Sequence, residues 1–330
     1  MFVRSIRVLC ASAKARREIE DTIQRISSKV LAPADQYKAF VAPNVHTIPL
    51  VIILGNHSAG KSTLINSLLG IEEQKTGVAP TDDGFTVLRR GDVSQDEDGP
   101  TAVSNPEYSF GDLRQFGSEF VNRFKVKTRA LPEQSRVPQG MMIVDTPGMI
   151  DSSAPKTEMT LNQDEIQKQH RGYNFLEVTR WFAKRADVIL IIFDPANPGT
   201  TSETLEVLKS SLKGMGHKLC IVLNKVDMFH KSTDFARCYG SLCWNLSKNM
   251  DHSNKDIPRI YTTFNERELD AAGKKLGGQA GMLSVEESAD ETLLKELRKE
   301  RLEIHHQLFC APLRRLDNLL TEADEAARQI

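Results

Sequence analysis

The fold of this chain is decided by the stretch Val51-Ile-Ile-Leu-Gly-Asn-His-Ser-Ala-Gly-Lys-Ser-Thr63. It begins with a continuous apolar run, which is typical of a parallel strand that is buried on both faces. The pattern GxxxxGK[ST] follows from Gly55 to Ser62, and its glycines let backbone N–H groups approach phosphate oxygens closely. A helix that begins near Thr63 would turn the positive end of its dipole toward the anion. The stretch therefore predicts a nucleotide-binding site at the end of a strand.

Two side chains of this loop have predicted chemical roles. Lys61 is expected to reach the β- and γ-phosphates, where its charge assists catalysis, and the hydroxyl of Ser62 is expected to bind Mg²⁺. The predicted phosphate-binding residues are Gly55, Asn56, His57, Ser58, Ala59, Gly60, Lys61, Ser62 and Thr63.

A second motif, Met141-Met-Ile-Val-Asp-Thr-Pro-Gly148, is predicted to be a strand that ends in an acidic turn. The carboxylate of Asp145 can hold Mg²⁺ through water, and the backbone N–H of Gly148 can be donated to a γ-phosphate. Asp-Thr-Pro-Gly is also a good turn sequence, so this motif gains its meaning from the loop that precedes it.

The third motif is Cys220-Ile-Val-Leu-Asn-Lys-Val-Asp227, a predicted buried strand that delivers Asn224, Lys225 and Asp227 to the base. An aspartate can accept hydrogen bonds from both the N1–H and the exocyclic amine of guanine, whereas adenine offers no such pair of donors. All three motifs follow predicted strands, which fits ligand binding at the mouth of an open α/β sheet.

Thr81 is a further candidate, in the loop Gly77-Val-Ala-Pro-Thr-Asp-Asp-Gly-Phe85 between the first two motifs. Its hydroxyl would bind Mg²⁺ and sense the γ-phosphate. An ordinary Pro-Thr-Asp turn explains the same residues equally well.

Several stretches resemble the EH-domain-containing (EHD) proteins, which are dynamin-related ATPases. Arg171-Gly-Tyr-Asn-Phe175 and the following residues up to Asp194 are similar to the RGYDF…WFAERVD…LLFD segment of that family, and Tyr239-Gly-Ser-Leu-Cys-Trp244 is similar to YGALMW. Pro80-Thr-Asp-Asp-Gly-Phe85 is similar to PTTDSF. The resemblance covers residues 20–330. It implies a dynamin-type nucleotidase domain, flanked by helices from both ends of the chain, that forms dimers or oligomers on membranes and remodels them.

This chain departs from the family where hydrolysis is organised. His57 stands at the place of the water-positioning glutamine of dynamin, and Met149 stands where Ras-like switches carry a catalytic glutamine. A thioether can neither orient nor deprotonate water, so His57 and Thr81 are the catalytic candidates, together with Lys61. The alternative for His57 is a solvated loop residue.

The preferred nucleotide is not decided by these observations. EHD proteins prefer adenine nucleotides despite an Asn-Lys-Ala-Asp motif, whereas Asp227 and the dynamin-like loop favour GTP. We expect GTP, with ATP as the close alternative.

Composition indicates an enzyme of a reducing compartment, and we expect a cytoplasmic protein with peripheral membrane contact. The formal net charge of −1 argues against nucleic acid as a partner, and the 5 cysteines show no metal-type spacing. No run is apolar enough to span a bilayer. Residues 1–17 are basic and amphipathic, which fits a mitochondrial transit peptide, an interfacial helix or the start of a helical domain.

The expected architecture is an α/β P-loop nucleotidase domain with a mainly parallel sheet of about six to eight strands and flanking helices from both termini. Residues 91–106 and 152–169 are expected to be mobile polar insertions. The apolar stripe Leu293, Leu297, Ile304 and Leu308 predicts a helix near the C-terminus. The predicted strands are 49–55, 85–89, 140–145, 187–194, 218–224 and 258–263. The predicted parts are a helical segment at 1–48, the nucleotidase domain at 49–275 and a helical segment at 276–330.

Three functions remain open on these grounds: a nucleotidase that assembles on membranes, a regulatory switch, and a scaffold that binds nucleotide without hydrolysing it.

Overall fold

The structure is a computed structural model, and it describes residues 25, 49–74, 84–132, 135, 137–138, 141–149, 171–196, 198, 201–229, 231–250, 258–264, 287–315 and 318. Thr81, the amphipathic segment 1–17 and the stretch 152–169 lie outside the described residues.

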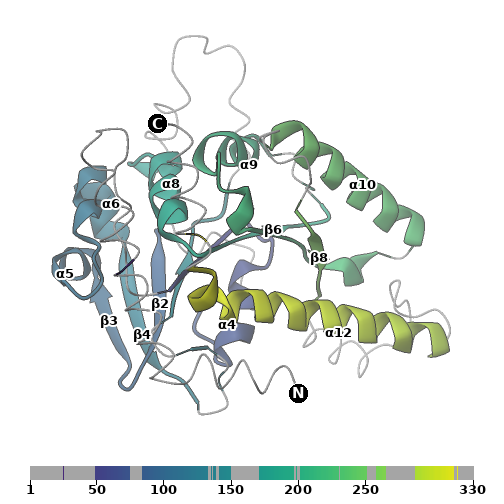
Figure 1. Cartoon of the computed structure of the whole chain (residues 1–330), viewed down its shortest axis with the longest axis horizontal. Helices are drawn as coiled ribbons and strands as arrows, with labels where there is room; N and C mark the ends of the chain where they lie inside the picture. Colours follow the sequence, from purple (N-terminus) through teal and green to yellow (C-terminus); the bar gives the residue numbers. More distant parts are fainter. Residues whose placement is uncertain are drawn as a thin grey trace, which may run out of the picture.

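In the described part of the chain, eight strands form one sheet in the order β3-β4-β2-β5-β1-β6-β7-β8 (Figure 1). Five of the seven neighbouring pairs are parallel, and the pairs β2–β5 and β3–β4 are antiparallel. The predicted mainly parallel α/β sheet is therefore confirmed. The strands are β1 (Leu50–Gly55), β2 (Thr86–Gly91), β3 (Gln95–Asp98), β4 (Lys125–Ala130), β5 (Met142–Asp145), β6 (Val188–Phe193), β7 (Leu219–Leu223) and β8 (Ile260–Thr262).

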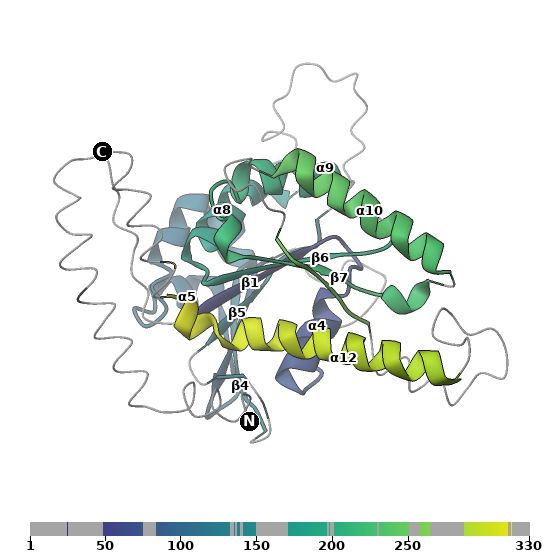
Figure 2. The ribbon, with the colours of Figure 1, turned by 45° about the vertical axis from the view of Figure 1, so that its right-hand side comes forward.

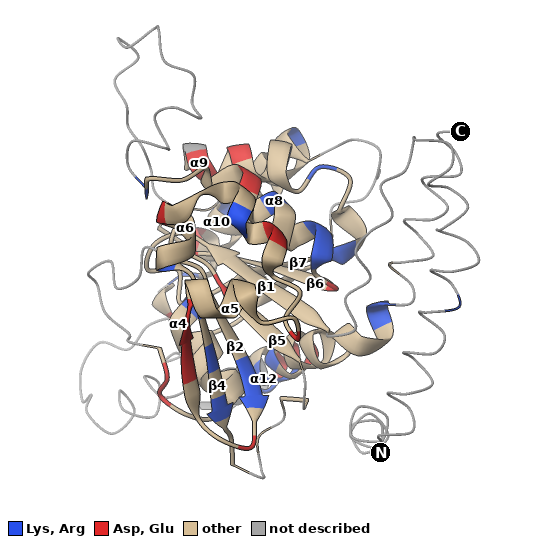
Figure 3. Ribbon diagram, turned by 90° about the vertical axis from the view of Figure 1, so that its left-hand side faces the viewer, with Lys and Arg blue, Asp and Glu red and all other residues tan. Residues whose placement is uncertain are grey.

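The expectation that residues 91–106 are a mobile insertion is wrong. They form strand β3 and helix α5 (Gly99–Ser104), and β3 pairs with β4 at the edge of the sheet. The acidic residues of β3 lie beside the basic residues of β4 (Figure 3), and Arg129 pairs with Asp96. The carboxylate of Asp98 then caps α5 by accepting a hydrogen bond from the N–H of Thr101 at 3.2 Å. Charge pairing at the strand pair and burial of Ala102 and Val103 in the core together order this polar sequence.

Helices cover both faces of the sheet, with α8, α9 and α10 on one side and α4 and α12 on the other (Figure 2). This is the layer arrangement that α/β domains use to bury both faces. The helices are α4 (Lys61–Leu69), α6 (Ser118–Arg123), α8 (Phe175–Arg185), α9 (Ser202–Glu206), α10 (Ser232–Asn249) and α12 (Glu287–Phe309), with a π-helical turn, η4 (Val207–Ser211), after α9. Short 3-10 turns are η3 (Gly111–Phe116), η5 (Gly216–Lys218) and η6 (Val226–Met228).

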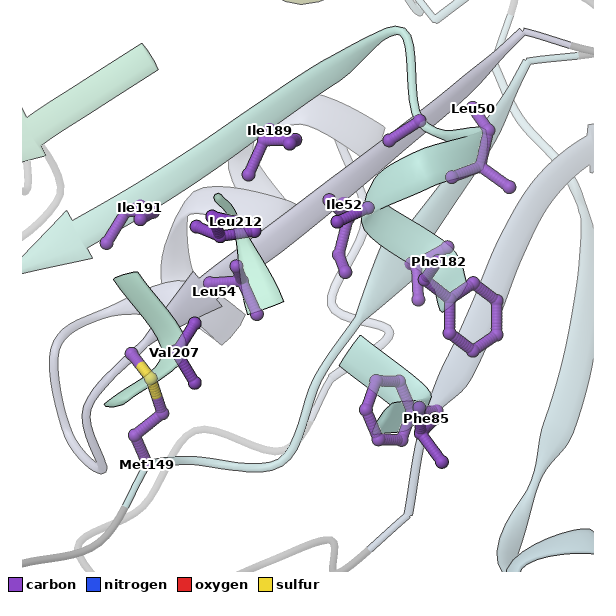
Figure 4. Packing of buried hydrophobic residues seen from close by; sticks show 14 of the residues in the cluster. Leu50, Ile52, Leu54, Phe85, Met149, Phe182, Ile189, Ile191, Val207 and Leu212 are labelled. Atoms are coloured by element: carbon purple, nitrogen blue, oxygen red, sulfur yellow. The ribbon is translucent and has the colours of Figure 1, made fainter. Parts of the chain in front are cut away.

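Strand β1 shows how the core is divided between the two faces. Ile52 and Leu54 point into the cluster under α8 and α9, and Ile53 points into the cluster under α4 and α12, as the two-residue period of a strand requires. Aromatic rings fill the first cluster, where Phe85 stacks on Phe182 with ring centroids 5.3 Å apart (Figure 4). A strand that is buried on both faces is thereby held rigidly where the phosphate loop begins.

Helix α12 packs on the face that carries α4. Its residues Leu297, Ile304 and Leu308 are buried, as the apolar stripe predicts, and each such side chain contributes about 1.5–3 kcal/mol when fully buried. Arg301 also donates a hydrogen bond to the hydroxyl of Ser67 in α4 at 2.5 Å. The boundaries of the three predicted parts remain predictions.

In the described part of the chain, the helices are too short or too polar to cross a membrane. Among the same residues, the thiols of Cys220, Cys238, Cys243 and Cys310 form no disulfide.

Candidate functional site

The loop that joins β1 to α4 needs glycine at both glycine positions of the GxxxxGK[ST] pattern, Gly55 and Gly60. Gly60 has a φ of +96°, and a Cβ there would lie 2.2 Å from the side-chain nitrogen of Asn224. A Cβ on Gly55 would lie 2.7 Å from the carbonyl oxygen of Ile192. The backbone therefore turns tightly between neighbouring strands, as the GxxxxGK[ST] pattern predicts.

Lys61 folds back over this loop at the start of α4. Its side-chain nitrogen donates hydrogen bonds to the carbonyl oxygens of Gly55 at 2.9 Å and Asn56 at 3.0 Å. Burial lowers the pKa of Lys61 to about 8, although the nearby charge of Asp145 opposes the shift. The loop thus holds a mostly buried ammonium group at the place where phosphates are predicted to bind.

Asp145 ends β5 beside this lysine, and its carboxylate is fixed by neighbours. Its Oδ2 accepts a hydrogen bond from the side-chain amide of Gln74 at 2.9 Å. Asn66 in α4 holds Gln74 in turn, because its side chain contacts both the N–H and the carbonyl of Gln74 at 2.8 Å. Sequence reasoning missed Gln74 and Asn66, since no spacing rule links them to Asp145.

Two side chains that could supply oxygen ligands to Mg²⁺ lie at this point. Ser62 lies in the first turn of α4 and Asp145 lies at the end of the strand beside β1. Within the described residues, no group of three or more histidine, cysteine or acidic side chains forms a metal cage. A hydroxyl and a carboxylate fit Mg²⁺, which keeps water and phosphate oxygens as its remaining ligands.

Gly148 and His57 lie against each other. The N–H of His57 donates to the carbonyl of Met149 at 3.1 Å, and the N–H of Met149 donates to the carbonyl of Gly55 at 3.1 Å. A Cβ on Gly148 would lie 2.9 Å from the Cα of His57, so glycine is required there. The His57 ring is half-buried, and its Nδ1 lies 2.9 Å from the hydroxyl of Ser58. The predicted γ-phosphate contact and the predicted catalytic histidine are therefore neighbours.

The side chain of Met149 turns the other way. It is 2% exposed and packs in the core near Leu54 and Val207 (Figure 4). It cannot reach a water at the nucleotide, which agrees with leaving it out of the catalytic set.

The base-reading motif follows β7. Asn224 donates a hydrogen bond from its side-chain amide to the carbonyl of Ala59 at 2.9 Å and so joins this motif to the phosphate loop. Lys225 has a φ of 57° and pairs with the carboxylate of Asp194 at 2.7 Å. Asp227 is half-buried in η6. The three predicted residues are thus grouped at the end of β7, next to the phosphate loop.

Two further residues contact the site, Thr204 from α9 and Arg171 from the segment that precedes α8. Arg171 donates a hydrogen bond to the carbonyl of Gly148 at 2.9 Å, and the hydroxyl of Thr204 donates to the side-chain oxygen of Asn56 at 2.6 Å. Arg171 stands in a run that marks the family resemblance, but nothing in the spacing predicts these contacts.

The structure therefore gathers the predicted residues of three motifs around one loop, with Thr81 outside the described residues. The loop offers backbone N–H groups and a cation for phosphates, the end of β5 offers a carboxylate for a metal, and the end of β7 offers a carboxylate for a base. These are the groups that phosphoryl transfer from a nucleoside triphosphate uses.

Curated proteins resemble most of this chain. It is 30% identical to EH domain-containing protein 1 of Arabidopsis thaliana over 295 residues, which are 86% of this chain and 50% of that protein. It is 31% identical to EH domain-containing protein 2 of Homo sapiens over 258 residues, 75% of this chain and 44% of that protein. EH domain-containing protein 3 of Mus musculus is 31% identical over 253 residues, 74% of this chain and 44% of that protein.

The chain spans about half the length of these curated relatives. The profile of the dynamin family matches residues 51–226, which include the first two motifs and the third up to Val226. The chain therefore belongs to the dynamin family.

Proposed function

We propose that this chain is a Mg²⁺-dependent nucleoside triphosphatase that binds GTP and assembles on membranes to remodel them. The observation that carries the proposal is the position of Lys61. Its ammonium group donates hydrogen bonds to the carbonyls of Gly55 and Asn56 and interacts electrostatically with the carboxylate of Asp145. A largely buried cation beside a carboxylate at a glycine loop is suited to neutralising charge that builds up on transferring phosphates.

Mg²⁺ would be held by the hydroxyl of Ser62 and, through water, by the carboxylate of Asp145, with Thr81 as a further ligand expected from the sequence. When bound, the ion neutralises charge on the phosphate oxygens. The contact from Gln74 keeps the Asp145 carboxylate in one orientation, so the carboxylate need not be reorganised during the reaction.

Asp227 and the contact between Asn224 and Ala59 favour guanine as the base. The carboxylate of Asp227 would accept two hydrogen bonds from guanine, while Asn224 keeps the base-reading turn next to the phosphate loop. ATP remains the alternative, because the EHD resemblance points to adenine nucleotides.

Hydrolysis of the β–γ phosphoanhydride bond needs a group that orients the attacking water. His57 is one candidate. Its backbone N–H donates to the carbonyl of Met149, the residue after the predicted γ-phosphate contact Gly148, and its ring is half-exposed. An imidazole in this place would orient the water or accept its proton. Thr81 is the second candidate.

Assembly through the nucleotidase domain is supported by helix α10, whose buried side chains are Leu242 and Leu246. Trp244 on this helix is 62% exposed, and Met228 before the helix is 58% exposed. Tryptophan is enriched at the centres of protein interfaces. We therefore place a homodimer contact on α10, and we propose that the protein is cytoplasmic and peripheral on membranes.

The test is turnover of GTP and of ATP in Mg²⁺, measured with and without liposomes. Turnover that liposomes stimulate would support the proposal. Binding of nucleotide without turnover under either condition would instead favour a regulatory switch or a scaffold, a reading consistent with the buried side chain of Met149 at the place of a Ras-like glutamine.

A further inference from the structure

Arg171 and Glu203 form a buried ion pair directly beside Gly148. Nη2 of Arg171 lies 2.9 Å from the carboxylate of Glu203 and donates to the carbonyl of Gly148 at 2.9 Å. The two side chains are 8% and 4% exposed, and the guanidinium lies over the ring of Phe175 at 4.2 Å. Burying two charges costs free energy unless further hydrogen bonds satisfy them. In this pair, one of those hydrogen bonds runs from Arg171 to the backbone carbonyl of Gly148, the residue that is predicted to contact the γ-phosphate.

The first turn of α9 reaches the other side of the same site. Glu203 stands between Thr201 and Thr204, and both hydroxyls donate to the side-chain oxygen of Asn56, at 3.2 Å and 2.6 Å. One helical turn therefore holds the phosphate loop directly at Asn56 and holds Gly148 through Arg171.

The contact at Asn56 and the contact at Gly148 lie close together, because the backbone of the phosphate loop is bridged to the loop after β5. Asn56 pairs with Met149 in an isolated parallel bridge, and Met149 packs near Val207, the first residue after α9 (Figure 4). The hydroxyls of Thr201 and Thr204 hold Asn56 without the ion pair, whereas Gly148 is held through Arg171. A pair whose role was only to attach α9 to the core would not need to bond to the carbonyl of Gly148.

We propose that Arg171 and Glu203 are positioning residues for the γ-phosphate: by holding the carbonyl of Gly148 they restrict the backbone of this glycine, so that its N–H, which belongs to the preceding peptide, meets the terminal phosphate of a nucleoside triphosphate. This inference rests on the proposed function, because it requires that Gly148 contact the γ-phosphate. A nucleoside diphosphate has no γ-phosphate, so its affinity depends on the phosphate loop and the base-reading turn alone. The pair should therefore matter for triphosphates and not for diphosphates.

The test is equilibrium binding of GDP and of a non-hydrolysable GTP analogue to the full chain. Arg171→Lys keeps the charge but loses the planar fork that reaches Gly148 and Glu203 together. We expect the affinity for the GTP analogue to fall roughly tenfold, as for the loss of one charged hydrogen bond, with the affinity for GDP changed less than about twofold.

Arg185 supplies a matched control on α8. It also pairs with a carboxylate, that of Asp112 at 2.9 Å, and lies over an aromatic ring, that of Trp181 at 3.6 Å. Arg185→Lys should leave both affinities unchanged. Glu203→Asp, which keeps the charge and withdraws the carboxylate by one methylene, is the second variant in case Arg171→Lys does not fold, and it should show the same loss confined to the triphosphate.

Equal losses for GDP and the GTP analogue, or no loss for either, would overturn the inference and leave a merely structural ion pair. Such an outcome would count against the inference alone if the parent protein bound both nucleotides and Lys61→Ala abolished that binding, because the proposed nucleotide site would then stand. A parent that bound neither nucleotide would overturn the proposed function and the inference together.

Discussion

The backbone N–H of His57 donates a hydrogen bond to the carbonyl of Met149 at 3.1 Å and so helps to join the loop after β1 to the loop after β5. The two side chains then diverge: the His57 ring stays half-exposed, while Met149 is buried in the core. If a side chain of this pair orients the attacking water, it is that of His57.

His57→Ala should therefore lower turnover by roughly ten- to ten-thousand-fold, the range for losing a positioned acid–base group, with little change in nucleotide affinity. Single-turnover hydrolysis, alongside binding of a non-hydrolysable analogue, measures both. His306→Ala in α12 is the control and should behave as the parent. Hydrolysis by His57→Ala at the parent rate would make His57 a loop residue and leave Thr81 or a partner subunit to position the water, because the Asn56 side chain is 4% exposed and already bound to Thr201 and Thr204.

Gly60→Ala and Gly70→Ala should separate backbone strain from steric clash. Both glycines have positive φ, +96° and +74°, so either substitution costs roughly 1–2 kcal/mol and lowers the melting temperature by a few degrees. A Cβ on Gly60 also meets Asn224, whereas one on Gly70 meets nothing within 4 Å. We expect at least about a tenfold loss of nucleotide affinity for Gly60→Ala alone. Equal affinities in the two variants would contradict the role given to the Asn224 contact.

Asp227→Asn tests the choice of base. The amide loses one acceptor and presents a mismatched donor, so GTP should be weakened far more than ATP. Competition of the two nucleotides against a fluorescent analogue gives both constants in one experiment. An equal effect, or none, would favour the adenine-binding alternative.

Trp244→Ala should impair assembly and leave nucleotide affinity unchanged, because the exposed ring lies on α10 and contributes little to the core. Analytical ultracentrifugation in the presence of a GTP analogue measures the dimer, and cosedimentation with liposomes measures the larger assembly. Leu302→Ala on α12 removes another exposed apolar side chain, 52% exposed, and serves as the control. Parent-like assembly of Trp244→Ala would exclude α10 as the contact.

Features carried by short-range patterns could be predicted from the sequence. The apolar runs predicted six strands, and the spacing of Gly55, Gly60 and Lys61 predicted a loop that requires glycine. Strands β3 and β4 were missed because their charged residues resemble a solvated loop until Arg129 and Asp96 meet across the strand pair. An alternating apolar pattern is absent there, so the pairing becomes visible only in three dimensions.

The same limit explains the missed residues of the site. Gln74 and Asp145 are 71 residues apart in the chain, and Arg171 and Glu203 are 32 apart. Their contacts depend on the order of strands in the sheet, which no local pattern encodes. The motif residues could be predicted because each is expected to contact the ligand by itself, whereas these residues are proposed to act through another residue.

The most direct test of the nucleotide site is equilibrium binding of a GTP analogue to the parent, to Lys61→Ala and to Lys218→Ala, with folding checked by thermal denaturation. Both lysines are buried, and the ammonium group of each donates to backbone carbonyls; that of Lys218 donates to the carbonyl of Lys184 at 3.1 Å, away from the loop. Lys61→Ala should abolish binding while remaining folded, because it removes the cation that meets the phosphates. Lys218→Ala, if folded, should bind as the parent does. Micromolar affinity retained by Lys61→Ala would contradict the assignment of this loop as the phosphate site.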